Sequence, residues 1–471
     1  MICLLVACAI PLLLLTVAQL WRSRTYRASF RLATRRNDFL GSRGDKQSFS
    51  VLLDADGFDL PFGLTAQGQT AFLTWEIEAT TAGHVFDPFV EVRCGEANYR
   101  QYFERGVAGR RHLNLSQIFE ERRESAPARV RMQSRSVRWK SAATLVLFEA
   151  PPGVQSAQTL VLAPHPDDAE IAAFGMYATH RSWVVTITAG ELGMEALSAV
   201  IAVGSDETSW CARLRVADSL TIPQLGDVPG ERCLNLVYPD GVLKSMYCQP
   251  TRPMKLPCEG TRSRADLRSQ NTAPEFRSAT PACTWRQLVA DIRRVLEASN
   301  PDIVVCPHPL IDVHPDHVFT TIALEEAARE IKNRHRFYFL YVVHPRHAQI
   351  YPFGPAESCI GYPPWTDEEW LTDSVYSVPL SPDVRSAKYF AIEAAHGLRT
   401  FSNGEPRTVG QVIRAAKEDL RALVGGTGLH ATTFLRRGPR PNEIYYVVSA
   451  DSLSQLVKRA LREHSCVRAN E

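Results

Sequence analysis

The first residues whose types and spacing could do chemistry follow a short apolar run, Leu160–Ala163. His165, Asp167 and Asp168 come next, in the sequence HPDD, where prolines break regular structure. His165 and Asp168 are three positions apart, so around one turn both side chains can point to the same place. An imidazole and a carboxylate that converge form half of a zinc site, and Asp167 is left free to act as a base on bound water. The alternative is a plain helix start, because aspartate also caps helices.

A second group of residues supplies what the first group lacks. Ile303–Cys306 is another short apolar run, and the sequence HPDH at His314–His317 follows it and opens a helix. In an α/β protein the carboxyl ends of parallel strands lie at one edge of the sheet, where sites are built. His317 would complete a site of two histidines and one aspartate with positions open for water and substrate. That ligand set is typical of a catalytic rather than a structural zinc.

These two motifs resemble the signatures of the PIG-L/LmbE family of zinc-dependent N-acetylglucosaminide deacetylases, in which an AHPDD-type motif precedes HPDH. TAGELG at Thr188–Gly193 and YPDG at Tyr238–Gly241 also look similar to family segments, and the resemblance covers about Gln158–Glu330. The family includes enzymes that de-N-acetylate glucosaminyl-phosphatidylinositol and enzymes of mycothiol and bacillithiol synthesis. The chain looks most like the PIG-L-type de-N-acetylases of bacterial lipopolysaccharide core synthesis.

The resemblance implies a role for each matching residue of the two motifs. It implies Zn²⁺ as the cofactor, held by His165, Asp168 and His317. Asp167 matches the general base of the family, and His314 matches the histidine that stabilises or protonates the tetrahedral intermediate. Iron or cobalt could also fill a site of two histidines and one carboxylate.

Further positions match family residues outside the metal site. Asp316 matches a residue that helps to orient the HPDH region. Asp240 falls near a position that the family uses to bind the sugar, as does one of two arginines, Arg213 or Arg215. The sequence departs from the family pattern at Pro164, where alanine is usual, so we expect the substrate to differ more than the metal.

Residues 155–465 predict an α/β domain with a Rossmann-like, mostly parallel sheet and helices on both faces. Short apolar runs alternate there with helical patterns, such as the amphipathic stretch that follows Thr284, a predicted N-cap. Residues 249–283 interrupt this order with a segment rich in Arg, Ser, Thr and Pro. We interpret this segment as a surface insertion near the site, either a flexible loop or a grip for an acidic glycolipid.

Residues 47–150 have a different sequence pattern, which predicts a small antiparallel β-sandwich. Several short β-rich runs are separated by turn residues, with little helical periodicity between them. Sandwiches of this kind often bind glycans, and five aromatic residues could serve: Trp75, Tyr99, Tyr102, Phe103 and Trp139. The alternative, which burial statistics favour, is that these aromatic residues pack the core of the sandwich.

The start of the chain predicts a membrane anchor. Residues 1–21 are apolar with no charged side chain, which is long enough for a transmembrane helix, and residues 22–46 read as a basic juxtamembrane linker. The positive-inside rule places the rest of the chain in the cytoplasm. The expected location is therefore a bacterial inner membrane, single-pass, with the catalytic domain cytoplasmic. A cleaved signal or a peripheral helix is the alternative.

Composition narrows the class of protein. The chain has 471 residues, of which 45% are hydrophobic, so it can bury sizeable cores in two or three domains. A net charge of +2 argues against a nucleic-acid partner. Eleven scattered cysteines without a CxxC pair favour reduced thiols in a cytosolic compartment.

The residue pattern predicts a metal-dependent enzyme, and the resemblance to the PIG-L/LmbE family implies that it is a zinc-dependent hydrolase that removes acetate from an N-acetylhexosamine. The expected substrate is a membrane-associated glycolipid or other lipid-linked amino sugar, foremost the lipopolysaccharide core, and no specific protein partner is predicted. Two alternatives stay open: a glycolipid-binding protein with an inactive hydrolase domain, and a deacetylase of a soluble N-acetylglucosaminyl conjugate.

Overall fold

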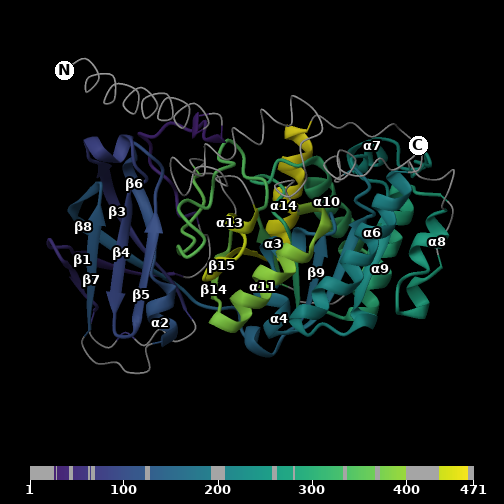
Figure 1. The fold of residues 1–471 in the computed structure, drawn as a ribbon, viewed down its shortest axis with the longest axis horizontal. Helices are drawn as coiled ribbons and strands as arrows, with labels where there is room; N and C mark the ends of the chain where they lie inside the picture. Colours follow the sequence, from purple (N-terminus) through teal and green to yellow (C-terminus); the bar gives the residue numbers. More distant parts are fainter. Residues whose placement is uncertain are drawn as a thin grey trace, which may run out of the picture.

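The computed structural model describes residues 26–464, apart from residues 28, 42–45, 62–63, 65–68, 122–127, 193–206, 257–262, 279–281, 332–336, 366–371 and 399–433. The described residues form a mixed α/β structure. Two four-stranded sheets come first along the chain, and a seven-stranded sheet with helices on both faces follows them (Figure 1).

The two N-terminal sheets are antiparallel, as the run of short strands predicted. One sheet has the order β1-β8-β3-β6 and the other has the order β2-β7-β4-β5. Their strands are β1 (Lys46–Leu52), β2 (Gly57–Asp59), β3 (Thr70–Ala79), β4 (Phe89–Cys94), β5 (Ala97–Tyr102), β6 (Ala108–Asn114), β7 (Arg129–Arg135) and β8 (Val137–Phe148). Two short helices join them, η1 (Thr81–His84) and α2 (Ser116–Glu121).

Most of the aromatic side chains proposed as glycan contacts instead pack in the core between these two sheets. Trp75, Tyr99 and Phe103 are buried, and the ring of Trp139 packs on that of Trp75 at a centroid distance of 5.3 Å. These four side chains therefore stabilise the fold by burying apolar surface. Tyr102 is only partly buried, at the end of β5.

The seven-stranded sheet has the order β11-β10-β9-β12-β13-β15-β14. Its first five strands in this order are parallel, and the last two pair antiparallel. The strands are β9 (Gln158–Ala163), β10 (Arg181–Thr188), β11 (Cys233–Tyr238), β12 (Ile303–Pro307), β13 (Phe337–Tyr341), β14 (Ser374–Pro379) and β15 (Asn442–Val448). β9 and β12 are almost wholly buried apolar runs, as expected for parallel strands covered on both faces.

The order in which strands are added to the sheet reverses between β9 and β12, although these two strands are parallel. From β9 the strand order runs to β10 and β11 on one side, and from β12 it runs to β13 on the other. Such a topological switch point leaves a crevice at the carboxyl ends of the two strands, where α/β proteins bind ligands. Both predicted motifs follow these two strands directly.

Helices cover both faces of this sheet. One face packs against α7 (Leu243–Cys248), α9 (Trp285–Ser299), α10 (Pro315–Arg329) and α14 (Ala450–Glu463). The other face packs against α3 (Asp168–Ala172), α4 (Phe174–Thr179) and α11 (Pro382–Ala394). The remaining described helices are α6 (Glu207–Thr221), α8 (Arg264–Arg268), α13 (Phe434–Arg437), η2 (Val154–Ser156), η3 (Ile222–Gly226), η4 (Gly230–Arg232), η5 (Pro274–Phe276) and η6 (His396–Leu398). Thr284 is the N-cap of α9, as predicted, because its hydroxyl accepts from the amide of Gln287.

The described part of the segment 249–283 is folded onto the sheet rather than free in solvent. Arg264 and Arg268 on α8 are buried, and both pair with Asp291 of α9, at 3.3 and 2.7 Å. A buried guanidinium with a buried carboxylate partner is a structural contact. These two arginines are therefore occupied inside the protein.

The sandwich and the α/β part contact each other directly. The side-chain amide of Asn114 on β6 donates to the carbonyl of Ile360 and to the hydroxyl of Ser377, both at 3.0 Å. The amide of Cys359 donates to the carbonyl of Arg100 on β5 at 2.8 Å. The loop that contains residues 359 and 360 thus belongs to the later part of the chain but packs on the sandwich.

The structure contradicts the prediction of a transmembrane helix. Among the helices that the structure describes, none is both long and apolar enough to cross a membrane. The longest of them have 15 residues, or about 22 Å at 1.5 Å per residue, against a hydrocarbon core of about 30 Å. The fold class that included this helix, and the single-pass location in an inner membrane, are therefore wrong. The prediction rested on hydropathy alone, and residues 1–21 lie outside the described residues.

A buried ion pair next to the sheet should be important for stability. Lys388 of α11 and Glu443 of β15 are both buried, with 2.6 Å between Nζ and Oε1, and Glu443 also accepts from the amides of Gly175 and Met176. We expect Lys388→Met to lower the free energy of unfolding by about 3–5 kcal/mol, because it leaves a buried carboxylate without a cation. Urea unfolding followed by tryptophan fluorescence measures this loss.

Lys140→Met is the matched control, since Lys140 pairs with Glu76 on an exposed surface. Exposed pairs contribute little, so its unfolding curve should overlay that of the wild type. Equal losses in the two variants would contradict the structural role of the buried pair.

Candidate active site

The turn after β9 presents the first motif. The hydroxyl and the amide of Thr188 both donate to the carbonyl of Pro164, at 2.8 and 3.0 Å, which fixes the turn against β10. Asp168 is the first residue of α3, and its carboxylate accepts from the amide of His165 at 2.9 Å. The turn is therefore rigid, and it aims both side chains across the end of the sheet toward β12.

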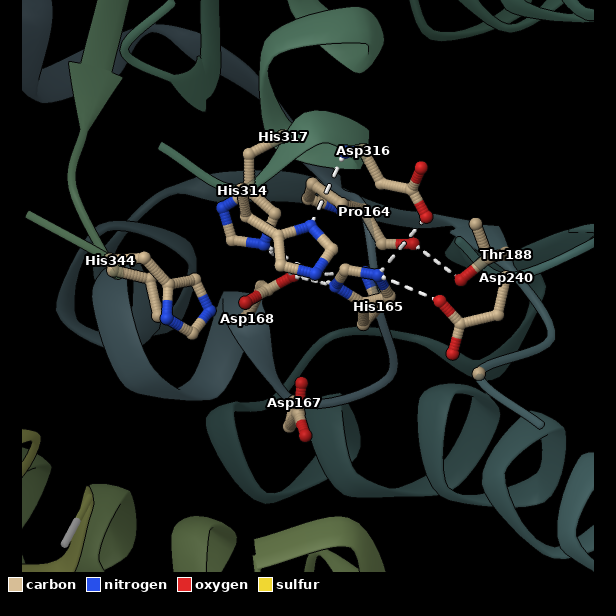
Figure 2. Close-up of polar contacts among 12 residues, drawn as sticks. Pro164, His165, Asp167, Asp168, Thr188, Asp240, His314, Asp316, His317 and His344 are labelled. Atoms are coloured by element: carbon tan, nitrogen blue, oxygen red, sulfur yellow. Dashed lines mark hydrogen bonds and ion pairs between the residues drawn. The ribbon is translucent and has the colours of Figure 1, made fainter. Parts of the chain in front are cut away.

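The second motif meets the first at the switch point. His165, Asp168 and His317 converge there (Figure 2). Asp168 Oδ2 lies 3.1 Å from His165 Nδ1 and 3.1 Å from His317 Nε2, and the two ring nitrogens are 3.3 Å apart. Metal–ligand bonds of about 2.0–2.1 Å at tetrahedral angles separate ligand atoms by about 3.3 Å. The three atoms thus form a triangle of the size that one zinc-like ion requires, and the donor set fits such a metal.

Two further histidines border this triangle. A nitrogen of His314 lies within 4.8 Å of ligand atoms of His165 and His317, and a nitrogen of His344 lies equally close to ligand atoms of Asp168 and His317. The rings of His314 and His344 are 5.4 Å apart. The site therefore holds more nitrogen donors than the three predicted ligands.

Carboxylates behind His165 and His317 fix the orientation of their rings. Asp312 Oδ2 lies 3.0 Å from His317 Nδ1 and also accepts from the backbone amides of residues 343 and 344. His165 Nε2 lies 3.1 Å from Asp240 Oδ1 and 3.5 Å from Asp316 Oδ2. Such second carboxylates are typical of metal-binding histidines, because they fix the ring and strengthen it as a ligand.

These carboxylates also set the protonation of the metal-free site. Burial lowers the pKa of His165, but its hydrogen bonds to aspartates outweigh burial and hold the pKa well above the usual value. Burial likewise lowers the pKa of His317, but Asp168 and Asp312 raise it to about 10. Burial raises the pKa of Asp168, while His317 and His165 bring it well below the usual value. Near pH 7 the metal-free site therefore contains two imidazolium ions held by ionised aspartates.

Asp167 lies apart from the triangle of His165, Asp168 and His317 (Figure 2). It pairs instead with Arg215 of α6. The distance from Arg215 Nη2 to Asp167 Oδ2 is 2.7 Å, and both side chains are largely buried. Burial raises the pKa of Asp167 and the Arg215 charge opposes it, with the net result above the usual value. Asp167 Oδ1 has no hydrogen-bond partner among the residues that the structure describes. That oxygen is available to a water molecule or a substrate.

His314 begins α10 and has a defined hydrogen-bond direction. Its Nδ1 accepts from the amide of Asp316 at 3.3 Å, so in the neutral ring the proton is on Nε2. Burial and the charges of His165 and His317 lower the pKa of His314, which keeps this ring neutral. His314 can therefore donate a hydrogen bond through Nε2.

The remaining predicted site residues differ in whether they line the cavity beside the two motifs. Asp240 and Arg215 line the same cavity as His165, Asp167, Asp168 and His314. Arg213 is exposed on α6, with its guanidinium over the ring of Trp210. Asp316 accepts from the amides of Gly241 and Leu243, at 2.7 and 3.1 Å. It therefore ties the β11 loop, which carries Asp240, to the HPDH motif.

The cavity has a volume of about 360 Å³ and opens from the ligand triangle. His165, Asp167 and Asp168 line it, and Leu192, Leu398 and Phe434 add apolar surface. Pockets of this size hold small ligands, with a few polar groups that fix orientation. One sugar ring with its acetamido group is a ligand of suitable size and polarity.

Two residues near the ligands were missed by the sequence analysis. Asp312 lies only five positions before His317 and is fully buried, but an isolated aspartate in a loop gives no distinctive signal. His344 did give one, because it follows β13, the strand next to β12. The strand-end argument used for the two motifs would have placed it at the same edge of the sheet.

Metal binding should release protons, since ligand imidazoles must lose theirs. The pKa of His317 is about 10 without metal, so at pH 7 this ring and that of His165 start protonated. We expect zinc to displace about two protons at pH 7 and fewer as the pH rises toward 10. Calorimetric titration with zinc in two buffers of different ionisation enthalpy counts these protons. The same heat in both buffers would contradict the two-imidazolium site.

Comparison with known proteins agrees with the resemblance to the PIG-L/LmbE family, but only over part of the chain. Residues 160–328 match the family model PIG-L, described as GlcNAc-PI de-N-acetylase. No curated protein matches the chain. The match includes both motifs and the strands β9 and β12 that present them.

Several solved structures show weak overall likeness. The zinc-inhibited form of teicoplanin deacetylase has 18% identity and a TM-score of 0.33, over 62% of this chain and 99% of that chain. The A40926 pseudoaglycone deacetylase has 15% identity and a TM-score of 0.33, over 62% and 98%. The hydratase GalB from Pseudomonas putida has 13% identity and a TM-score of 0.31, over 62% and 95%. None of these likenesses assigns an activity to this chain, and the family match is confined to residues 160–328.

Proposed function

We propose that this protein is a metal-dependent hydrolase that removes the acetyl group from an N-acetylhexosamine and releases acetate. The observation that carries the proposal is the triangle of His165, Asp168 and His317. His165 and Asp168 line one cavity together with Asp167. The match to a de-N-acetylase family model over these motifs supports the same reaction.

The metal that fits the donor set best is zinc. Two imidazole nitrogens and one carboxylate oxygen leave room for other ligands, as in catalytic zinc sites. A zinc ion held here supplies Lewis acidity, which polarises an acyl carbonyl and makes a water molecule more acidic. The carboxylates behind His165 and His317 hold both rings in place for it.

Asp167 is the proposed general base. Its Oδ2 is held by Arg215, so the carboxylate has a fixed orientation and Oδ1 is left to accept a proton from water. Burial keeps the pKa of this carboxyl above the usual value. This brings the pKa nearer to the working pH, where a group serves best as both general base and general acid. The protonated Asp167 then gives the proton to the departing amine, so the proton balance closes.

His314 is the proposed donor to the oxyanion that develops on the acetyl oxygen. Its Nδ1 is occupied by the amide of Asp316, so Nε2–H is the group that can donate. A preorganised donor of this kind is worth about 3 kcal/mol of transition-state stabilisation. Asp240, whose carboxylate also contacts His165, is the proposed contact for a sugar hydroxyl.

The proposed substrate class is a glycolipid that carries an N-acetylhexosamine. The description of the matching family model names such a compound, GlcNAc-PI. The lipopolysaccharide core is the specific glycolipid that we propose to test. A soluble N-acetylglucosaminyl conjugate is the second substrate to compare.

Asp167→Asn should separate catalysis from metal binding. It keeps the shape of the side chain but removes the base, so we expect acetate release to fall by about 10²–10⁴-fold with zinc content unchanged. The measurement is the amount of acetate released from each of three substrates. They are lipopolysaccharide core oligosaccharide, N-acetylglucosaminyl-phosphatidylinositol and free N-acetylglucosamine. Bound zinc is measured on the same samples.

Asp451→Asn on α14 is the matched control, because Asp451 is exposed and far along the chain from the motifs. It should leave both acetate release and zinc content at the wild-type level. A wild-type protein that binds these sugars but releases no acetate would overturn the proposal in favour of a binding protein.

A further inference from the structure

A second cavity lies in the N-terminal sandwich and shares no lining residue with the catalytic one. It has a volume of about 430 Å³. The cavity is lined by residues of η1 and the segment after it, by the ends of β4, β5 and β7, and by Pro355. Pro355 belongs to the segment between β13 and β14, whose residues 359 and 360 pack on the sandwich. Cavities at such junctions are common places for ligands.

Backbone contacts hold the walls of this cavity in place. The amide of Thr80 donates to the carbonyl of Ser136 at 3.0 Å, and the amide of Gly106 donates to the carbonyl of Gly83 at 2.9 Å. A Cβ atom on Gly83 would lie 2.3 Å from the Ser136 oxygen, so only glycine allows this close approach. The cavity is therefore formed before any ligand arrives.

Aromatic side chains give the cavity flat apolar surfaces. Phe86 is 62% exposed at its edge, next to Val85, which is 39% exposed. Phe89 and Tyr102 pack together inside it with ring centroids 4.8 Å apart. An exposed phenylalanine contributes nothing to the core, and the C–H face of a pyranose stacks well on such a ring.

Charged groups stand beside these rings. Arg105 Nε lies 2.5 Å from Asp87 Oδ1, and the Arg105 guanidinium is also over the ring of Tyr26, so its position is fixed. This pair offers donors and acceptors suited to sugar hydroxyls. Arg135 is exposed, and its side chain makes no ion pair or hydrogen bond with any described residue.

We propose that this cavity binds a pyranose that carries a carboxylate, as in a uronic-acid-containing glycan. Phe86 provides the stacking surface, and Arg135 provides a planar fork that matches a carboxylate through two parallel hydrogen bonds. One unpaired guanidinium suits a singly charged planar anion, whereas phosphate sites in proteins collect several donors. The proposal is independent of the reaction at the metal site.

The test is calorimetric binding of two probes to the full-length protein in the Asp167→Asn background, which prevents turnover. Hyaluronan hexasaccharide and chitohexaose have equal length and both contain N-acetylglucosamine, but only the first carries carboxylates. We expect hyaluronan hexasaccharide to bind at least about tenfold more tightly, a difference of about 1.4 kcal/mol. Phe86→Ala and Arg135→Ala should each weaken its binding at least about fivefold.

Each variant has a matched control. Phe390→Ala removes an equally exposed phenylalanine, 62%, from α11, and Arg131→Ala removes an exposed arginine from the same strand as Arg135. Both should bind hyaluronan hexasaccharide like the parent. Hydrogen exchange with this probe should slow at backbone amides of residues 81–89, which places the ligand in this cavity rather than at the metal site.

Three outcomes would overturn the proposal that this cavity binds a glycan of this kind. They are the absence of binding by hyaluronan hexasaccharide, protection confined to residues outside 81–89, and equal affinity of the four variants. Equal binding of chitohexaose and hyaluronan hexasaccharide would overturn the assignment of a carboxylate-bearing ligand.

Discussion

The parallel pairing of β9 with β12 is the constraint on which the site depends. Its register, with Val161 opposite Val305, brings the turn after β9 and the start of α10 to one edge of the sheet. Because strand order reverses there, no crossover helix fills the space between the two strand ends. Residues that are distant in the sequence thus meet with their ligand atoms 3.1–3.3 Å apart. A displacement of either strand by one residue would turn its side chains to the opposite face and separate the ligands.

Charge balance explains how so many acidic groups remain buried at this edge. Asp168 and Asp312 have almost no exposed surface, and buried carboxylates are costly unless they are paired. In the metal-free protein, protons on His165 and His317 supply the compensating charge. A divalent cation brings the same charge as these two protons. The same aspartates can therefore stabilise either state, and the fold does not need to rearrange when metal replaces protons.

The sequence predicted the part of the site that is local and left out the part that depends on tertiary contacts. His165, Asp168 and His317 were predicted as ligands because each sits in a compact motif after an apolar run, and the structure brings the three side chains together. Arg213 and Arg215 could not be separated, because only the packing of α6 decides which of them faces the cavity. Asp312 carried no pattern of its own. The fold prediction failed where a 21-residue hydropathy run was taken as a membrane helix, and no described helix supports it.

The measurement that tests the central claim most directly is X-ray absorption at the zinc edge of the zinc-loaded protein. The account predicts a mixed shell of two imidazole nitrogens and at least one oxygen at about 2.0–2.1 Å. His317→Ala should remove one imidazole from that shell. A shell that contains sulfur at about 2.3 Å, or one that is unchanged in His317→Ala, would place the metal elsewhere and contradict the account.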